Sequence, residues 1–209
     1  MNADELRTAT SALLAALKLR DEGTHDHSRR VARVSALLGL RLGLSREELL
    51  HLHTGAILHD IGKIQTKEAV LKKPGRHDYF ECQHMKEHAR AGAEMLSGLG
   101  FPSEVVSIVW EHHERCDGLG YPFMLKGSEI CAGARIVAVA DAFDAITNDR
   151  CYRAGRSYQA AAAAITRGVK TQFDQVVVEA FFQIPEEKLY ERLPNILVSA
   201  LPHAATLRA

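Results

Sequence analysis

Two pairs of neighbouring metal-binding side chains stand out in this sequence. His59 is followed directly by Asp60, and His112 is followed directly by His113. Such side chains are costly to bury unless they are paired or bind a cation, so two adjacent pairs are unusual in an ordinary core. Mixed imidazole and carboxylate ligands suit iron, manganese or zinc better than calcium, which prefers oxygen ligands. The two pairs therefore predict a transition-metal site.

Two further positions fit such a site, but each also has an ordinary explanation. Asp141 lies in an apolar helical stretch, where a carboxylate needs either a metal ion or an ion-pair partner. His88 lies one helical turn after His84, so the two could share a metal ion, although chance pairs at this spacing are common. His51 and His53 diverge on a helix and are predicted not to be ligands.

Glycine turns follow both pairs. Gly62 and Lys63 come directly after the first pair and its isoleucine, and residues 118–122, which read Gly-Leu-Gly-Tyr-Pro, follow the second. Glycine lets the backbone approach a phosphate closely, and a lysine nearby supplies positive charge. The turns predict a phosphate-binding wall beside the metal site.

The elements that must position these residues are predicted to be helices throughout. Apolar residues recur at helical spacing, and a capping box of Ser45 and Glu48 marks one helix start. No alternating run of β-branched or aromatic residues predicts a strand. The predicted helices cover residues 1–20, 31–42, 45–60, 81–96, 103–113, 129–148, 174–183 and 186–193, with another from residue 157 and a basic loop over 63–80. The sequence therefore predicts a single all-α domain.

Composition limits the class of partner. The chain has 209 residues, enough for one domain with a sizeable core, and 26 basic residues balance 26 acidic ones. No overall charge favours polymeric nucleic acid or a membrane surface, and no apolar run approaches the roughly 18 residues that span a bilayer. The start lacks the pattern of a signal peptide, and the four cysteines are widely spaced. We expect a cytoplasmic protein without a membrane span.

The order of these motifs resembles the HD-GYP family of metal-dependent cyclic di-GMP phosphodiesterases, a branch of the HD phosphohydrolase superfamily. The likeness runs from about residue 20 to residue 182. It implies a single HD-type helical bundle, with an N-terminal helix over 1–20, an HD-GYP domain over 21–185 and a C-terminal extension over 186–209. The matching segments are His27-Ser28, His59 to Lys63, Lys73 to Gly75, Met85 to His88, His112 to Pro122, Ala134 to Ile136, Asp141 to Ala145, Asp149-Arg150 and Gln172 to Asp174.

The resemblance also implies roles for individual residues. It implies two divalent metal ions, iron or manganese first, with zinc or nickel also compatible. The implied ligands are His27, His59, Asp60 and Asp141 for one ion, with Asp60 bridging to a second ion held by His88, His112 and His113. The implied catalytic residues are Asp60 and Lys63, and the implied substrate contacts are Lys63, Gly120, Tyr121, Pro122, Arg150 and Arg153.

One departure from the family sets the expected number of metal ions. Family members with three ions carry a glutamate four residues before the first histidine ligand. Here that position is Gly23, and Glu22 is one residue out of register. We therefore expect two metal ions rather than three.

The implied reaction is hydrolysis of cyclic di-GMP to linear pGpG, and to GMP if cleavage continues, by a hydroxide that bridges two metal ions. Two other classes stay open. One is an HD-type phosphohydrolase that acts on another nucleotide or cyclic dinucleotide, and the other is a non-catalytic module that binds a dinucleotide or a protein. Because about 20 residues precede the domain, too few for a receiver domain, regulation would come from expression or from a partner such as a diguanylate cyclase or a regulator.

Overall fold

A computed structural model of the chain describes residues 1–149 and 154–191, and within these ranges every regular element is a helix. The all-α prediction is confirmed. The α-helices are α1 (Ala3–Arg20), α2 (Glu22–Arg41), α3 (Arg46–Leu58), α4 (Glu68–Leu71), α5 (Tyr79–Gly98), α6 (Ser103–Glu111), α7 (Ala132–Thr147), α8 (Tyr158–Arg167) and α9 (Gln175–Phe182). Short 3₁₀ helices are η1 (Ile61–Gln65), η2 (Gly127–Glu129) and η3 (Glu186–Leu189).

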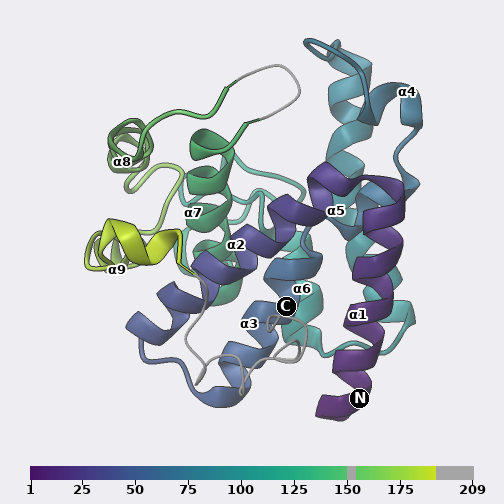
Figure 1. The fold of residues 1–209 in the computed structure, drawn as a ribbon, viewed down its shortest axis with the longest axis horizontal. Helices are drawn as coiled ribbons and strands as arrows, with labels where there is room; N and C mark the ends of the chain where they lie inside the picture. The colour runs from purple at the N-terminus through teal and green to yellow at the C-terminus, as the bar shows by residue number, and fades with distance from the viewer. Residues whose placement is uncertain (150–153, 192–209) are drawn as a thin grey trace.

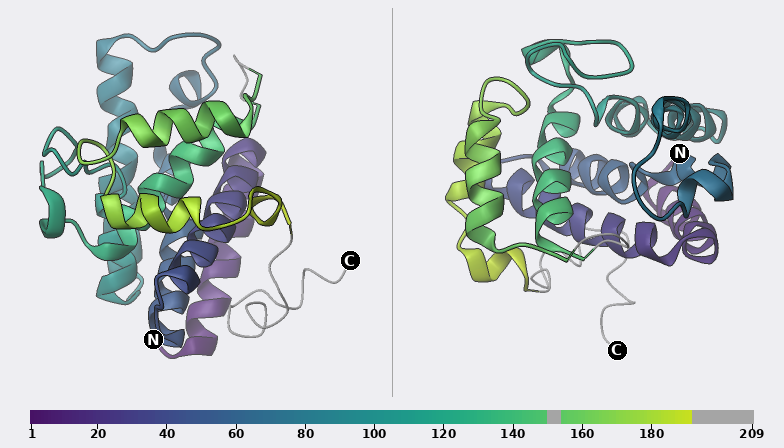
Figure 2. Two further views of the ribbon diagram at one scale, coloured as in Figure 1. Left: turned by 90° about the vertical axis from the view of Figure 1, so that its left-hand side faces the viewer. Right: turned by 90° about the horizontal axis from the view of Figure 1, so that it is seen from above.

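One hydrophobic core joins these helices into a single bundle. Helices α2, α3, α6 and α7 pack against one another around buried side chains such as Leu52 and Phe143. Helix α1 packs on α2, α3 and η1, where it buries Leu17. Helices α8 and α9 lie on the opposite side of the bundle from α1, and they bury Ile165 and Phe181 in the same core (Figures 1 and 2). The N-terminal helix therefore belongs to the body of the domain.

A close contact between η1 and α5 fixes the segment that follows α3. A Cβ atom at Gly62 would lie 2.0 Å from the carbonyl oxygen of His88 and 2.6 Å from the amide nitrogen of Gly92. No real side chain tolerates such distances, so only glycine lets the two backbones approach this closely. Because His59 and Asp60 lie just before Gly62, this approach brings them toward His88.

The segment over residues 63–80 differs from its prediction as a loop. It contains the end of η1, the short helix α4 and the start of α5 at Tyr79. Val70 is buried, which explains why one turn of helix forms in a stretch that is otherwise basic. Asp78 and Glu81 form a capping box that starts α5 earlier than its apolar pattern suggested.

Other boundaries are close to those predicted. Helix α7 begins at Ala132 rather than near residue 129, and the last predicted helix is the 3₁₀ turn η3, which ends at Leu189. The proposed divisions at residues 20 and 185 stay predictions. Within the described residues, no helix combines the length and the apolar character that crossing a bilayer needs.

Candidate metal centre

Seven side chains from separate elements converge at one place. The ligand atoms of His88, His112 and His113 lie within 4.8 Å of one another, and so do those of two further groups. These groups are His27, His59 and Asp141, and His59, Asp60 and His112. Since the third group shares one histidine with each of the others, the three form one continuous cluster. The structure thus brings together all the residues predicted as ligands, while their role as ligands stays a prediction.

Three of the histidines are held in the same way. The Nδ1 atoms of His59, His88 and His112 donate to backbone carbonyl oxygens three residues earlier, at distances of 2.7, 2.6 and 2.8 Å. A carbonyl oxygen only accepts, so each Nδ1 atom carries the proton. The Nε2 atom of each neutral ring is therefore left with a lone pair, which is the form that binds a metal ion.

The contact between His88 and His112 tests whether a cation fits this cluster. Their Nε2 atoms lie 3.2 Å apart, and neither nitrogen of a neutral pair has a proton to place between them. Two lone pairs at this distance repel each other, whereas a divalent cation would attract both. The Oδ1 atom of Asp60 also lies 3.3 Å from the His88 Nε2 atom. The donor set therefore fits a bound cation better than an ordinary polar core.

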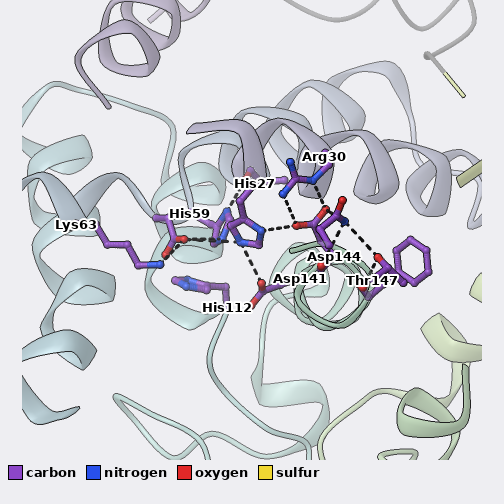
Figure 3. A network of polar contacts seen from close by, with 12 residues as sticks. His27, Arg30, His59, Lys63, His112, Asp141, Asp144 and Thr147 are labelled. Carbon is purple, nitrogen blue, oxygen red and sulfur yellow. Dashed lines mark hydrogen bonds and ion pairs between the residues drawn. The ribbon is translucent and has the colours of Figure 1, made fainter. Parts of the chain in front are cut away.

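Asp60 lies at the middle of the cluster. Its Oδ2 atom is 3.4 Å from the His59 Nε2 atom and 3.8 Å from that of His27, while Oδ1 faces His88. Each oxygen thus faces a different set of histidines, as a bridging carboxylate would. The Lys63 ammonium lies 2.6 Å from Oδ2, and Figure 3 shows it approaching from the side away from His27.

His27 is held differently, by a carboxylate rather than a carbonyl. Its Nδ1 atom lies 2.7 Å from Oδ2 of Asp144, and its Nε2 atom lies 3.2 Å from Oδ1 of Asp141 (Figure 3). Arg30 donates two hydrogen bonds to the Asp144 carboxylate, and Asn148 donates a third. Sequence reasoning gave Asp144 no role. Its spacing of three residues from Asp141, on one face of α7, was the signal that could have found it.

Burial and charge set opposite protonation states across the cluster. Burial lowers the pKa of His113 to about 3, helped by repulsion from His88, so this ring is neutral. Burial would also lower the pKa of His27, but hydrogen bonds to Asp141 and Asp144 outweigh it and raise the pKa to about 9. Binding a cation at the His27 Nε2 atom would therefore displace a proton.

The pKa of Asp60 is also displaced. Burial would raise it, but the Lys63 ammonium and the neighbouring His59 ring outweigh burial and hold the pKa well below its usual range. Asp60 is therefore a carboxylate, the form that can bridge two cations.

Exposure differs among the side chains of the cluster and its neighbour Lys63. The side chains of His59 and Asp60 are 1% and 3% exposed, whereas those of Asp141 and Lys63 are 20% and 21% exposed. Asp141 and Lys63 are therefore more accessible to solvent than His59 and Asp60.

The glycine-rich turn forms a wall beside His113. The Tyr121 ring packs on the His113 ring, with centroids 4.8 Å apart, and the Tyr121 amide donates to the His113 carbonyl. The buried carboxylate of Glu114 accepts hydrogen bonds from the amides of Phe123 and Leu125, at 2.6 and 3.1 Å. Sequence reasoning quoted Glu114 within its motif and missed that it ties the turn to the segment that carries His112 and His113.

The remaining predicted residues have different outcomes. Gly120 lies in the turn, where a Cβ atom would come 2.5 Å from the Glu114 backbone, and Pro122 is exposed beside Tyr121. His84 accepts a hydrogen bond from the Lys67 amide. Arg150 and Arg153 were also predicted to contact the substrate, and both lie outside the described residues.

The sequence model of the HD domain family matches residues 12–177 of this chain. The chain belongs to the HD domain family. Among curated relatives, the cyclic di-GMP phosphodiesterase response regulator RpfG of Xanthomonas campestris is 41% identical over 179 residues, 85% of this chain and 47% of that protein. The 3'3'-cGAMP-specific phosphodiesterase 3 of Vibrio cholerae is 34% identical and covers 82% of this chain and 38% of that protein. The chain therefore spans less than half the length of these relatives.

Solved structures share the HD fold. The chain resembles a cyclic GMP-AMP specific phosphodiesterase of V. cholerae with a TM-score of 0.69 and 20% identity, over 93% of this chain and 53% of that one. It also resembles the HD domain of the L. monocytogenes phosphodiesterase PgpH in complex with cyclic-di-AMP, with a TM-score of 0.62 and 16% identity, over 88% and 99% of the two chains. At these identities, the likeness supports the fold alone.

Proposed function

We propose that this chain is a metal-dependent phosphodiesterase that hydrolyses cyclic di-GMP or a related cyclic dinucleotide. The observation that carries the proposal is the cluster in which neutral imidazoles and the ionised carboxylate of Asp60 face one another. The curated relatives named for phosphodiesterase activity on cyclic dinucleotides support this substrate class. We also propose that the protein acts in the cytoplasm.

The cluster divides into two sets of donors around Asp60. One set is His27, His59 and Asp141, which we propose as the first ion site, and the other is His88, His112 and His113. Two divalent ions, iron or manganese in our proposal, would supply a hydroxide nucleophile and neutralise charge on the phosphoryl oxygens.

The protein's own residues would orient the substrate. Lys63 is partly exposed, and its ammonium, held against Asp60, would donate to a non-bridging phosphate oxygen. Tyr121 would line the wall next to His113, in a turn that packs closely on the Glu114 backbone because residue 120 is glycine. We propose further phosphate or base contacts from Arg150 and Arg153. The first product would be linear pGpG.

The test is turnover by protein purified without oxygen and analysed for bound metal. Cyclic di-GMP, the mixed GMP-AMP cyclic dinucleotide and linear pGpG would be assayed separately, with iron, manganese, zinc or nickel added. We expect turnover of at least one cyclic dinucleotide, loss of turnover with a chelator and recovery on adding metal. If no metal supported turnover but a cyclic dinucleotide still bound, the chain would be a binding module rather than an enzyme.

A further inference from the structure

Lys86 is a cation next to the proposed site with no assigned role. It lies on α5, two residues before His88, and its Nζ atom is 5.2 Å from the centroid of the Tyr121 ring. The same ring packs on His113. The ammonium is therefore separated from the metal-binding cluster by one aromatic ring.

The charge of Lys86 has no carboxylate partner within residues 1–149 and 154–191. Its neighbours on and near α5 are paired: Arg90 bridges to Glu87 and Glu94, and Lys73 bridges to Glu81. Lys63 is also paired, with Asp60. An exposed cation–π contact contributes only about 0.5–1 kcal/mol, so it holds the ammonium in place and leaves it available to an anion.

A cyclic dinucleotide carries two phosphodiester groups, and only one can lie at the metal centre during hydrolysis. Lys63 lies at that centre, against Asp60, whereas Lys86 contacts Tyr121, the ring that packs on His113. Two ammonium groups, one against Asp60 and one against the Tyr121 ring, match a substrate with one reacting and one spectator phosphate. We propose that Lys86 binds the second phosphate, the one that is not hydrolysed, and so selects dinucleotides over simple phosphodiesters. This inference rests on the function proposed above.

The experiment compares a substrate with two phosphates to a substrate with one. Cyclic di-GMP and bis(p-nitrophenyl) phosphate would be assayed with the metal-loaded wild type and with Lys86→Met, which keeps an unbranched apolar stem but removes the charge. We expect the ratio of kcat/KM for cyclic di-GMP to that for bis(p-nitrophenyl) phosphate to fall about tenfold. The loss should be mainly in KM, because a spectator phosphate is bound equally before and during the reaction.

Two further variants separate charge from packing. Lys86→Arg keeps a cation and should restore most of the ratio. Arg90→Gln removes one positive charge from an exposed position on the same helix and should leave the ratio at its wild-type value. A non-hydrolysable phosphorothioate analogue of cyclic di-GMP should bind Lys86→Met about tenfold more weakly than wild type.

The possible outcomes are distinct. An unchanged ratio in Lys86→Met, with an active wild type, would overturn the role of Lys86 alone. An equal loss with both substrates would also overturn it, because Lys86 would then act at the reacting phosphate or through Tyr121. A wild type that neither hydrolyses these substrates nor binds the analogue would overturn the proposed function together with this inference.

Discussion

The Asp144 carboxylate lies 2.7 Å from the Nδ1 atom of His27 and so turns the Nε2 atom of that ring toward Asp141. A histidine ligand whose other nitrogen is held by a carboxylate has a set tautomer and a set orientation, and its basicity is raised. Arg30 and Asn148 orient the carboxylate in turn. Helix α7 therefore supplies Asp141, a proposed ligand, and Asp144, which orients His27, a proposed ligand on α2.

We predict that Asp144→Asn weakens metal binding. The amide is nearly isosteric, but it removes the negative charge that holds His27, so affinity at the first ion site should fall about 10–100-fold. Titration of the apo protein with Co²⁺, followed by visible absorption, would measure this. Asp174→Asn is the control, because Asp174 pairs with Arg135, a residue outside the cluster. Equal Co²⁺ affinity in Asp144→Asn and wild type would contradict the assigned role.

Asp60→Asn should abolish turnover. The amide keeps the shape of the side chain but loses the charge through which both oxygens attract cations, and it leaves the Lys63 ammonium without its partner. We expect kcat to fall by at least about a hundredfold. Bound metal per chain, measured by mass spectrometry, should fall below the two ions that we propose for the wild type. Circular dichroism would establish that the variant is folded, and wild-type turnover in a folded variant would rule out a bridging role.

Residue types and local periodicity carried much of the fold and of the proposed site. The adjacent pairs His59-Asp60 and His112-His113 stood out, because buried imidazole and carboxylate groups are costly unless they are paired or bind a cation. The helices followed from apolar spacing, except that α4 is one turn long and depends on the burial of Val70. Whether such a short helix forms depends on tertiary contacts, and these cannot be read from local sequence patterns.

What the sequence could not supply was pairing between distant residues. His88 and His84 were equivalent on spacing alone, and only the packing of α5 against η1 turns His88 toward Asp60. The spacing of Asp144 from Asp141 indicated a shared helix face, but not the partners of Asp144, because His27 and Arg30 lie on α2, far away along the chain.

Glu114 provides a test of whether the glycine-rich turn matters to substrate binding. We predict that Glu114→Gln destabilises the protein by about 1–2 kcal/mol. The amides of Phe123 and Leu125 donate to different oxygens of the carboxylate, and glutamine keeps only one oxygen, because its NH2 group cannot accept a hydrogen bond. KM for the cyclic dinucleotide should rise, while the metal content stays at the wild-type level. Chemical denaturation and steady-state kinetics would measure the two effects.

Glu129→Gln is the matched control for Glu114→Gln. Glu129 also accepts a hydrogen bond from a backbone amide, that of Lys126, but it is exposed. Its loss should change stability and KM less than the loss of Glu114. If both variants raised KM equally, the buried carboxylate would have no special part in placing Tyr121.

The contact of Gly62 with α5 predicts a strong effect from a single methyl group. In Gly62→Ala the new Cβ atom would meet the His88 carbonyl at 2.0 Å, so η1 and α5 would have to separate. We expect a loss of more than about 2 kcal/mol of unfolding free energy. Metal affinity should fall as well, because this contact places Asp60 against His88. Gly98→Ala is the control on α5, the other partner of this contact, since nothing lies within 4 Å of its added Cβ atom. Alanine has the higher helix propensity, so this variant should be as stable as wild type or more so. Equal stability of the two variants in urea denaturation would show that the close approach of η1 to α5 is not what places His59 and Asp60 next to His88.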